Sequence, residues 1–175
     1  MRTFFKLLTV ILIGLSLSCS TEKKGHTRFT SGYGISDYSH ILETTAKDSI
    51  GTLIRKLEQE VGSQIGILIV DSLAGEKIED FSLRMAREFG LGRSTHNDGI
   101  LITVVMHERL IRIEVGAGLE NIIKDEVAAG IIRDDMTPLF KREKYGQGIY
   151  LAVDKISNLI VENEKLVGSE PTERD

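Results

Sequence analysis

The sequence predicts an α/β domain with a small mixed sheet. Two runs rich in Ile and Val, 100–105 and 110–115, are separated only by residues 106–109, which indicates an antiparallel hairpin. A third apolar run, 65–70, has no polar interruption, as expected of a strand that is covered on both faces. A helical pattern connects it to the hairpin, and such an order predicts a parallel pair with a right-handed connection. The expected sheet is a parallel pair plus one antiparallel hairpin strand, with the last strand at an edge.

The N-terminal residues are typical of a targeting segment. Arg2 and Lys6 give it a positive first part, and the apolar stretch 7–17 that follows is too short to span a bilayer stably. Ser16-Leu17-Ser18-Cys19 resembles a bacterial lipobox, although Ser16 stands where that motif usually has Leu. We expect residues 1–18 to be a lipoprotein-type signal peptide and Cys19, the only cysteine, to be lipidated. A plain signal peptide cut near Cys19 is the alternative.

The charge of the chain argues against a nucleic-acid partner. The formal net charge is −4, and it becomes −6 when Arg2 and Lys6 leave with residues 1–18. An acidic chain without a basic stripe is poorly suited to phosphate backbones. Residues 19–36 are polar and rich in Gly and Ser, which predicts a flexible tether between a membrane and the domain.

Helical spacing of apolar residues marks the helices. It is found in three stretches, 45–61, 78–89 and 145–160. Gly62 and Gly90 follow the first two stretches and are placed to end those helices. The tail, 162–175, is polar and contains Pro171, so we expect it to be disordered.

A shorter helix is predicted to begin at Glu126, with Asp125 as its N-cap and Pro138 as its end. At about 100° per residue, Asp134 falls inside the apolar sector of this helix and Asp135 lies at its margin. A carboxylate in that sector must be paired or bound, because burying an unpaired charge costs several kcal/mol.

These acidic residues suggest a metal site. In an antiparallel hairpin, the residues that enter the first strand lie beside those that leave the second. Asn97 and Asp98 should therefore meet the glycine turn 116–118 and the acidic residues that follow it. Oxygen ligands of this kind suit Ca²⁺ or Mg²⁺, whereas the absence of thiols there disfavours zinc. The candidate ligands are Asp98, Asp125, Asp134 and Asp135, with Asn97, Glu126 and His96 nearby.

Structural roles are the alternative for each candidate. Asp98 could form the turn before Gly99, Asp125 could only cap its helix, and Asp134 could pair with Arg93 or Arg112. Asp71, at the end of a predicted strand, could either belong to a site or begin a loop.

Nucleotide binding is not expected. Gly116 and Gly118 follow a strand, but no third glycine completes a dinucleotide fingerprint, and the chain has no P-loop. It also lacks the G-x-S-x-G elbow of serine hydrolases.

An ordered series of motifs resembles the TPM domain family. The series runs from Asn97-Asp98-Gly99 through the hairpin, Gly116-x-Gly118-Leu119-Glu120, Pro138 and Tyr145-Gly146. The resemblance implies a three-layer α/β/α sandwich over residues 37–161, on the extracytoplasmic side of a membrane. Family members are described as thylakoid-lumen acid phosphatases and as bacterial envelope proteins that bind divalent cations. Carried over by position, the family's acidic cluster falls on Asp98, Asp125 and Asp134, with Asp135 adjoining.

Two functions are therefore expected. The first is a lipid-anchored module of the bacterial cell envelope, which binds a divalent cation and an envelope protein partner. The alternative is a metal-dependent acid phosphatase, in which the ion would polarise a phosphoryl oxygen and activate water. The sequence offers no evident nucleophile, and only Arg93 and Arg112 could clamp a phosphate, so we favour the module.

Overall fold

The computed structural model describes residues 34–169 and contains one four-stranded mixed sheet in the order β1-β2-β3-β4. Strands β1 (Ile35–Asp37), β2 (Gln64–Val70) and β3 (Gly99–Val105) are parallel to one another. Strand β4 (Leu110–Val115) is antiparallel to β3 and lies at the edge. The predicted parallel pair, hairpin and edge strand are confirmed. Cys19 and residues 1–33 lie outside the described residues.

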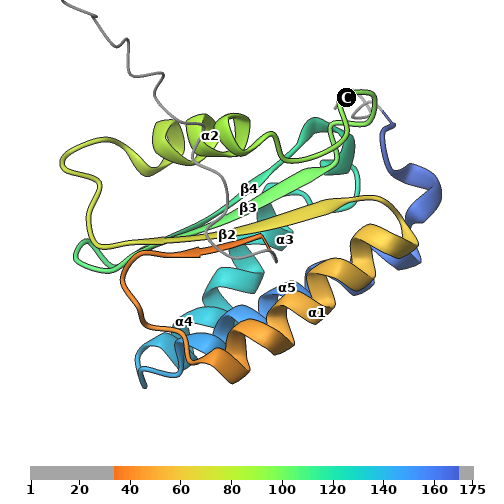
Figure 1. The fold of residues 1–175 in the computed structure, drawn as a ribbon. Coiled ribbons are helices and arrows are strands. Elements are labelled where there is room, and N and C mark those ends of the chain that lie inside the picture. The colour runs from red at the N-terminus through yellow and green to blue at the C-terminus, as the bar shows by residue number, and fades with distance from the viewer. Residues whose placement is uncertain (1–33, 170–175) are drawn as a thin grey trace, which may run out of the picture.

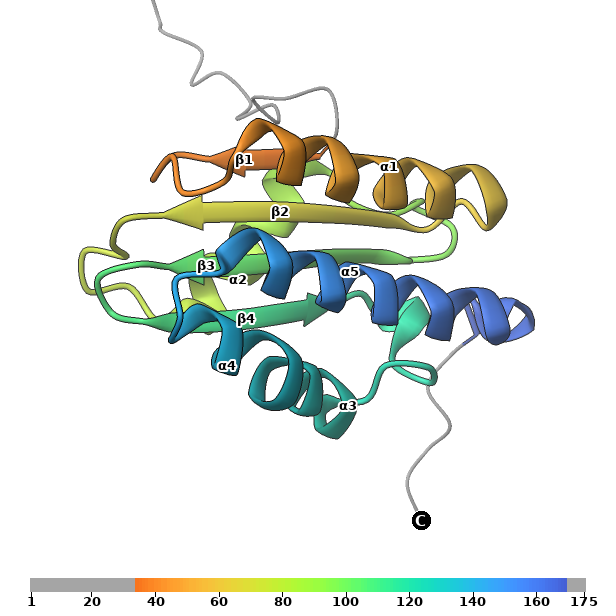
Figure 2. The same cartoon turned by 90° about the horizontal axis from the view of Figure 1, so that it is seen from below.

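Helices cover both faces of the sheet, so the domain is a three-layer α/β/α sandwich (Figure 1). Figure 2 shows α1 and α5 side by side across one face, with α3 and α4 beyond them, while α2 lies on the other face. The helices are α1 (Thr44–Glu60), α2 (Ile78–Phe89), α3 (Asp125–Gly130), α4 (Thr137–Phe140) and α5 (Tyr145–Glu162). Three short turns complete the fold: η1 (Ala117–Leu119), η2 (Ile131–Met136) and η3 (Glu164–Leu166).

The sheet divides the apolar core into two unequal parts. Along β2, Ile67 and Ile69 face the large cluster beneath α1 and α5, whereas Leu68 faces the small cluster beneath α2. All three side chains are fully buried. The uninterrupted apolar run predicted a strand covered on both faces, and the alternation of side chains across the sheet explains why both faces need apolar residues.

Strand β1 was not predicted from the sequence. It has only three residues, too few to show a period, and it is stabilised by parallel pairing with residues 67–69 of β2. Because β1, β2 and β3 are consecutive parallel neighbours while α1 and α2 lie on opposite faces, the two crossover connections have opposite hands. Strand β1 begins at Ile35, two residues before the expected start of the domain at residue 37.

The helix expected from Glu126 to Pro138 is divided into three parts. It starts at Asp125 rather than Glu126, with Lys124 at the N-cap and no side-chain cap. Residues 131–136 then form a wider, π-type turn. Pro138 does not end the helix but lies in the first turn of α4, where its missing N–H is tolerated.

Candidate functional site

The two ends of the hairpin meet as predicted, at what we call the corner: residues 92–98 together with residues 116–121. The amide of Gly116 donates to the carbonyl of Gly99 at 2.8 Å, and the amide of Gly118 donates to the carbonyl of Asn97 at 3.1 Å. A Cβ atom on Gly118 would collide with the carbonyl oxygen of His96. Glycine is therefore required here because two backbones approach each other too closely for any side chain.

Asp98, the central candidate, is bound inside the protein by Arg93. Its side chain is 0% exposed, while that of Arg93 is 38% exposed. Oδ1 accepts the backbone N–H of Arg93 at 2.7 Å, and Oδ2 accepts its Nε at 2.8 Å and its Nη2 at 2.5 Å. The hydroxyl of Ser63 also donates to Oδ2, at 3.3 Å. Both carboxylate oxygens are thus satisfied by protein donors, as a buried charge requires.

This pairing shapes the loop between α2 and β3. The amide of Asn97 donates to the carbonyl of Arg93 at 2.7 Å, and the side-chain oxygen of Gln64 accepts the amide of Gly92 at 2.9 Å. Asn97 adopts a left-handed conformation with φ of 50°, which asparagine tolerates better than most residues. The loop is therefore fixed at both ends and at its centre. Of the alternatives weighed from the sequence, the turn-forming role of Asp98 matches this geometry.

The other three candidates lie on the helical segment that follows the corner. Asp125 is exposed at the start of α3. Asp134 pairs with Arg133 at 2.7 Å, and this hydrogen bond lowers the pKa of the Asp134 carboxyl. Asp135 pairs with Nζ of Lys155 at 2.8 Å. Among residues 34–169, no three His, Cys, Asp or Glu side chains are grouped so that they could hold a metal ion.

Asp134 does not lie inside an apolar sector, so that expectation is wrong. Its side chain is 57% exposed. The prediction assumed a regular α-helix, but in the π-type turn of residues 131–136 each residue rotates less about the axis. Asp134 is consequently carried out to solvent. Metal binding by the four carboxylates stays a prediction, and with this arrangement an ion at Asp98 would have to displace Arg93.

The C-terminal segment also reaches the corner, which the sequence did not indicate. The amide of Gly168 donates to the carbonyl of Gly118 at 2.9 Å, and Nδ2 of Asn121 donates to Oγ of Ser169 at 2.9 Å. Residues 162–169 were expected to be disordered, but Glu162 belongs to α5 and residues 164–166 form η3. Their polar composition concealed the few specific contacts that hold them.

A family model for the TPM domain matches residues 35–159, which is most of the chain. The chain belongs to the TPM domain family. The matched segment runs from β1 into α5, so it includes the corner and excludes η3 and the residues after it. No curated protein matches the chain significantly.

Solved bacterial structures share the fold of this TPM domain. The N-terminal domain of a P. gingivalis protein is 23% identical with a TM-score of 0.70, covering 82% of this chain and 88% of its own. The BA42 protein of the psychrophilic bacterium Bizionia argentinensis is 16% identical with a TM-score of 0.62, covering 79% and 90%. The N-terminal domain of a Corynebacterium glutamicum protein is 11% identical with a TM-score of 0.58, covering 81% and 85%. At these identities the likeness establishes the fold alone.

The opposite end of the TPM domain's parallel strands also carries acidic residues, and one of them, Asp37, holds a loop. The buried carboxylate of Asp37 accepts the amides of Ile41 at 3.2 Å and Leu42 at 3.0 Å, and it pairs with Nζ of Lys47 at 2.9 Å. Asp71, at the end of β2, is exposed. Within residues 34–169, no helix has the length and apolar character needed to cross a membrane.

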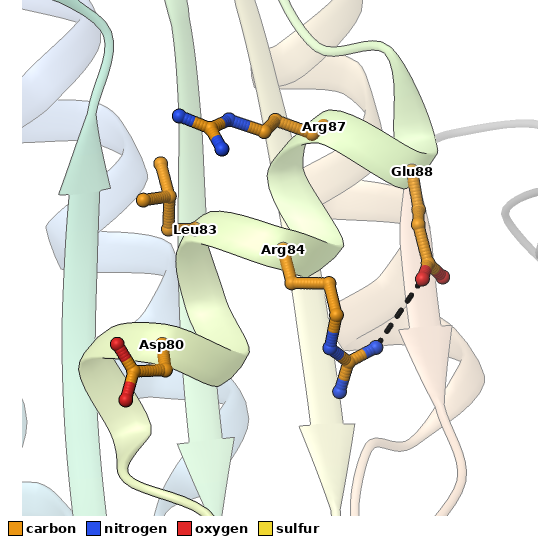
Figure 3. A pocket seen from close by; sticks show the side chains of 5 residues that line it. All are labelled: Asp80, Leu83, Arg84, Arg87 and Glu88. Carbon is orange, nitrogen blue, oxygen red and sulfur yellow. Dashed lines mark hydrogen bonds and ion pairs between the residues drawn. The ribbon is translucent and has the colours of Figure 1, made fainter.

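A hollow on helix α2 does not offer an anion clamp. It is lined by Asp80, Leu83, Arg84, Arg87 and Glu88 (Figure 3). The guanidinium of Arg84 lies 2.8 Å from Glu76 and 3.3 Å from Glu88. Hydrogen bonds to Glu76 and then Glu88 raise the pKa of Arg84, so its charge is already matched by two carboxylates. Exposed pairs of this kind contribute little to stability or binding.

Proposed function

We propose that this TPM domain is a membrane-tethered binding module of the cell envelope and that the corner is its binding surface. The observation that carries the proposal is the state of Asp98, whose two oxygens are both engaged by Arg93, with Ser63 assisting. A carboxylate held in this way fixes the shape of a loop. Such fixed loops suit recognition, because little conformational freedom is lost when a partner binds.

The same observation argues against a hydrolase. A general base must reach the proton that it accepts, and Asp98 is fully buried behind a guanidinium. His96 shares a hydrogen bond of 2.8 Å through Nδ1 with the hydroxyl of its neighbour Thr95. Arg93 could otherwise bind a phosphate, but its guanidinium already forms an ion pair with Asp98. Phosphate-ester hydrolysis therefore remains the less favoured function.

A divalent cation would bind at the corner by replacing Arg93 as the partner of Asp98. Asp98 is the natural first ligand because its carboxylate already lies 3.3 Å from the hydroxyl oxygen of Ser63, a second atom of the kind that these ions bind. The side-chain oxygen of Gln64 accepts the amide of Gly92 in the same loop. We propose that Ca²⁺ or Mg²⁺ binds there only when the guanidinium leaves. Asp125, Asp134 and Asp135 would then contribute through rearrangement of the segment after the corner.

One set of measurements tests these proposals together. Hydrolysis of a phosphate ester and the thermal unfolding midpoint are measured with and without Ca²⁺, Mg²⁺ and Mn²⁺. The proteins compared are wild type, Asp98→Asn and Arg93→Ala, with Asp71→Asn as a control that removes an exposed carboxylate away from the corner. The module predicts no turnover in any variant. Metal-dependent turnover that Asp98→Asn abolishes and Asp71→Asn leaves intact would establish the phosphatase instead.

The cation proposal has its own outcome in the same data. Because binding to the folded state alone stabilises it, a bound ion raises the unfolding midpoint. Arg93→Ala should enlarge the rise produced by Ca²⁺ and Asp98→Asn should abolish it. If Ca²⁺ raised the unfolding midpoint of all four proteins equally, Asp98 would not be a ligand of the ion.

The tether is proposed from the sequence alone. Lipidation of Cys19 would hold the module at the outer face of a membrane. A single acyl chain binds membranes only weakly, whereas two or more signals anchor a protein stably. Cys19→Ala is expected to move the chain from the membrane fraction to the soluble fraction, and an unchanged distribution would contradict the lipid anchor.

A further inference from the structure

The end of the described chain turns back onto the corner. After α5, the turn η3 directs residues 166–169 toward the loop that follows β4, where the blue end of the ribbon lies beside that loop (Figure 1). We call residues 166–169 the strap. The strap lies beyond the segment that matches the TPM family model, which ends at residue 159.

Hydrogen bonds from both the main chain and a side chain join the strap to the corner. One contact is through the main chain, from the amide of Gly168 to the carbonyl of Gly118 at 2.9 Å. A second is from Nδ2 of Asn121 to the hydroxyl of Ser169 at 2.9 Å. Main-chain bonds give affinity to bound peptides, and side-chain contacts give them specificity.

Gly168 is required by what it faces. A Cβ atom at this position would lie 2.8 Å from Cδ2 of the His96 ring, and the φ of Gly168 is +79°. The contact with the imidazole and the left-handed backbone both favour glycine at this position. Together, His96, Gly118 and Asn121 define a recognition pattern for a glycine followed by a small hydroxyl residue.

The strap is held by few other contacts. Val167 is partly buried against the main core, whereas Leu166 is 43% exposed. The amide and hydroxyl of Ser169 both bond back to the carbonyl of Leu166, at 3.1 Å and 2.6 Å. Segments with so few buried contacts open locally without unfolding of the whole domain.

We propose that the corner recognises a peptide turn of the type apolar-Gly-Ser, and that the strap is a built-in occupant which must leave before such a turn can enter. This inference rests on the proposed binding function and names its ligand class. The strap then regulates the module, because it competes with the free peptide for the corner. An occupant on a short linker has an effective concentration of roughly millimolar.

Amide hydrogen exchange of the full chain tests the first half of the proposal. The amide of Gly168 should exchange by local opening, at a rate that low denaturant concentrations leave unchanged. Amides of β3 should exchange only through larger, denaturant-sensitive unfolding. Exchange of Gly168 together with β3 would show that the strap is a permanent part of the fold and would overturn the proposal.

Peptide binding tests the second half. The probe is a synthetic peptide with the sequence Leu-Val-Gly-Ser-Glu, and the control peptide has Ala in place of Gly. Binding is followed through the NMR signals of His96, Gly118 and Asn121 in wild type, Gly168→Ala and Gly75→Ala. Gly75 is a matched control, because its φ of +92° imposes the same backbone strain while a Cβ there would contact nothing.

Gly168→Ala should expel the strap and bind the glycine peptide about tenfold more tightly than wild type, because more of the protein is then binding-competent. Gly75→Ala should bind as wild type does. Equal affinity of all three proteins, or no binding by any of them, would overturn the proposal. If Gly168→Ala does not fold, the exchange behaviour of wild-type Gly168 decides alone. None of these outcomes depends on the hydrolysis and cation measurements, so the two proposals fail separately.

Discussion

Arg93 grips Asp98 with both its backbone and its side chain: the backbone N–H lies 2.7 Å from Oδ1, and Nε lies 2.8 Å from Oδ2. The two residues are only five positions apart, so the pair closes the loop between α2 and β3 upon itself. The carboxylate therefore closes the loop immediately before β3, which begins at Gly99.

Arg93→Ala should destabilise the domain strongly. Removing one partner leaves a buried carboxylate without its counter-charge, which typically costs about 3–5 kcal/mol of unfolding free energy. We expect a loss at the lower end of this range, about 3 kcal/mol, because the guanidinium is partly exposed. Urea unfolding measures the change in free energy. Arg133→Ala is the control, since it breaks the exposed pair with Asp134 and should leave stability unchanged within error. Equal effects of the two substitutions would refute the structural role of the Asp98 pair.

Gly118→Ala should also destabilise the domain, by about 2–3 kcal/mol, because the new Cβ is forced against the carbonyl oxygen of His96 and the backbones must separate. Gly130→Ala is the matched control. Gly130 has a helical φ of −62°, and a Cβ there would approach only the end of Arg133, at 4.0 Å. Its substitution should therefore stabilise the protein by about 0.5–1 kcal/mol. Thermal unfolding of both variants checks the opposite signs, and a stabilising Gly118→Ala would contradict the close approach.

Asp37→Ala should destabilise the first crossover. Its carboxylate satisfies the amides of Ile41 and Leu42, and both amides would lose their acceptor. Each buried donor left unsatisfied costs about 1–3 kcal/mol, so a loss of at least about 2 kcal/mol is expected. Asp71→Ala, at the exposed end of β2, is the comparison. Exchange of the Leu42 amide should accelerate in the first variant only.

Glu108 should make stability fall in acid. Hydrogen bonds from the Ser72 hydroxyl at 2.6 Å and then the Leu73 amide at 3.0 Å lower the pKa of Glu108. A carboxyl whose folded pKa is lowered stabilises the protein above its unfolded pKa, about 4.3 for glutamate, and loses that contribution as pH falls through the folded value.

NMR titration of the carboxyl checks this sign. Ser72→Ala should move the pKa of Glu108 back toward its ordinary value and weaken the acid dependence. A pKa above the ordinary value in wild type would contradict the control of this carboxyl by the two hydrogen bonds.

The sequence by itself determined the framework of this protein. The runs that form β2, β3 and β4 and the spacing in α1, α2 and α5 predicted the mixed sheet and the main helices, because burial of one face leaves a period in the sequence. Antiparallel pairing then required Asp98 to meet the glycine turn, and the hydrogen bonds of Gly116 and Gly118 confirm it. Local sequence sufficed wherever a residue's environment followed from its own element.

Only the tertiary structure decided what the acidic residues touch. Partner choice depends on where side chains from separate segments end in space, and no period records it. The sequence considered Arg93 as a partner for Asp134, but the loop geometry gives it to Asp98. The π-type turn exposes Asp134 to solvent. Gly168 and Ser169 of the polar tail form hydrogen bonds with Gly118 and Asn121. Composition cannot reveal such contacts, because their stability comes from geometry and not from the amount of apolar surface buried.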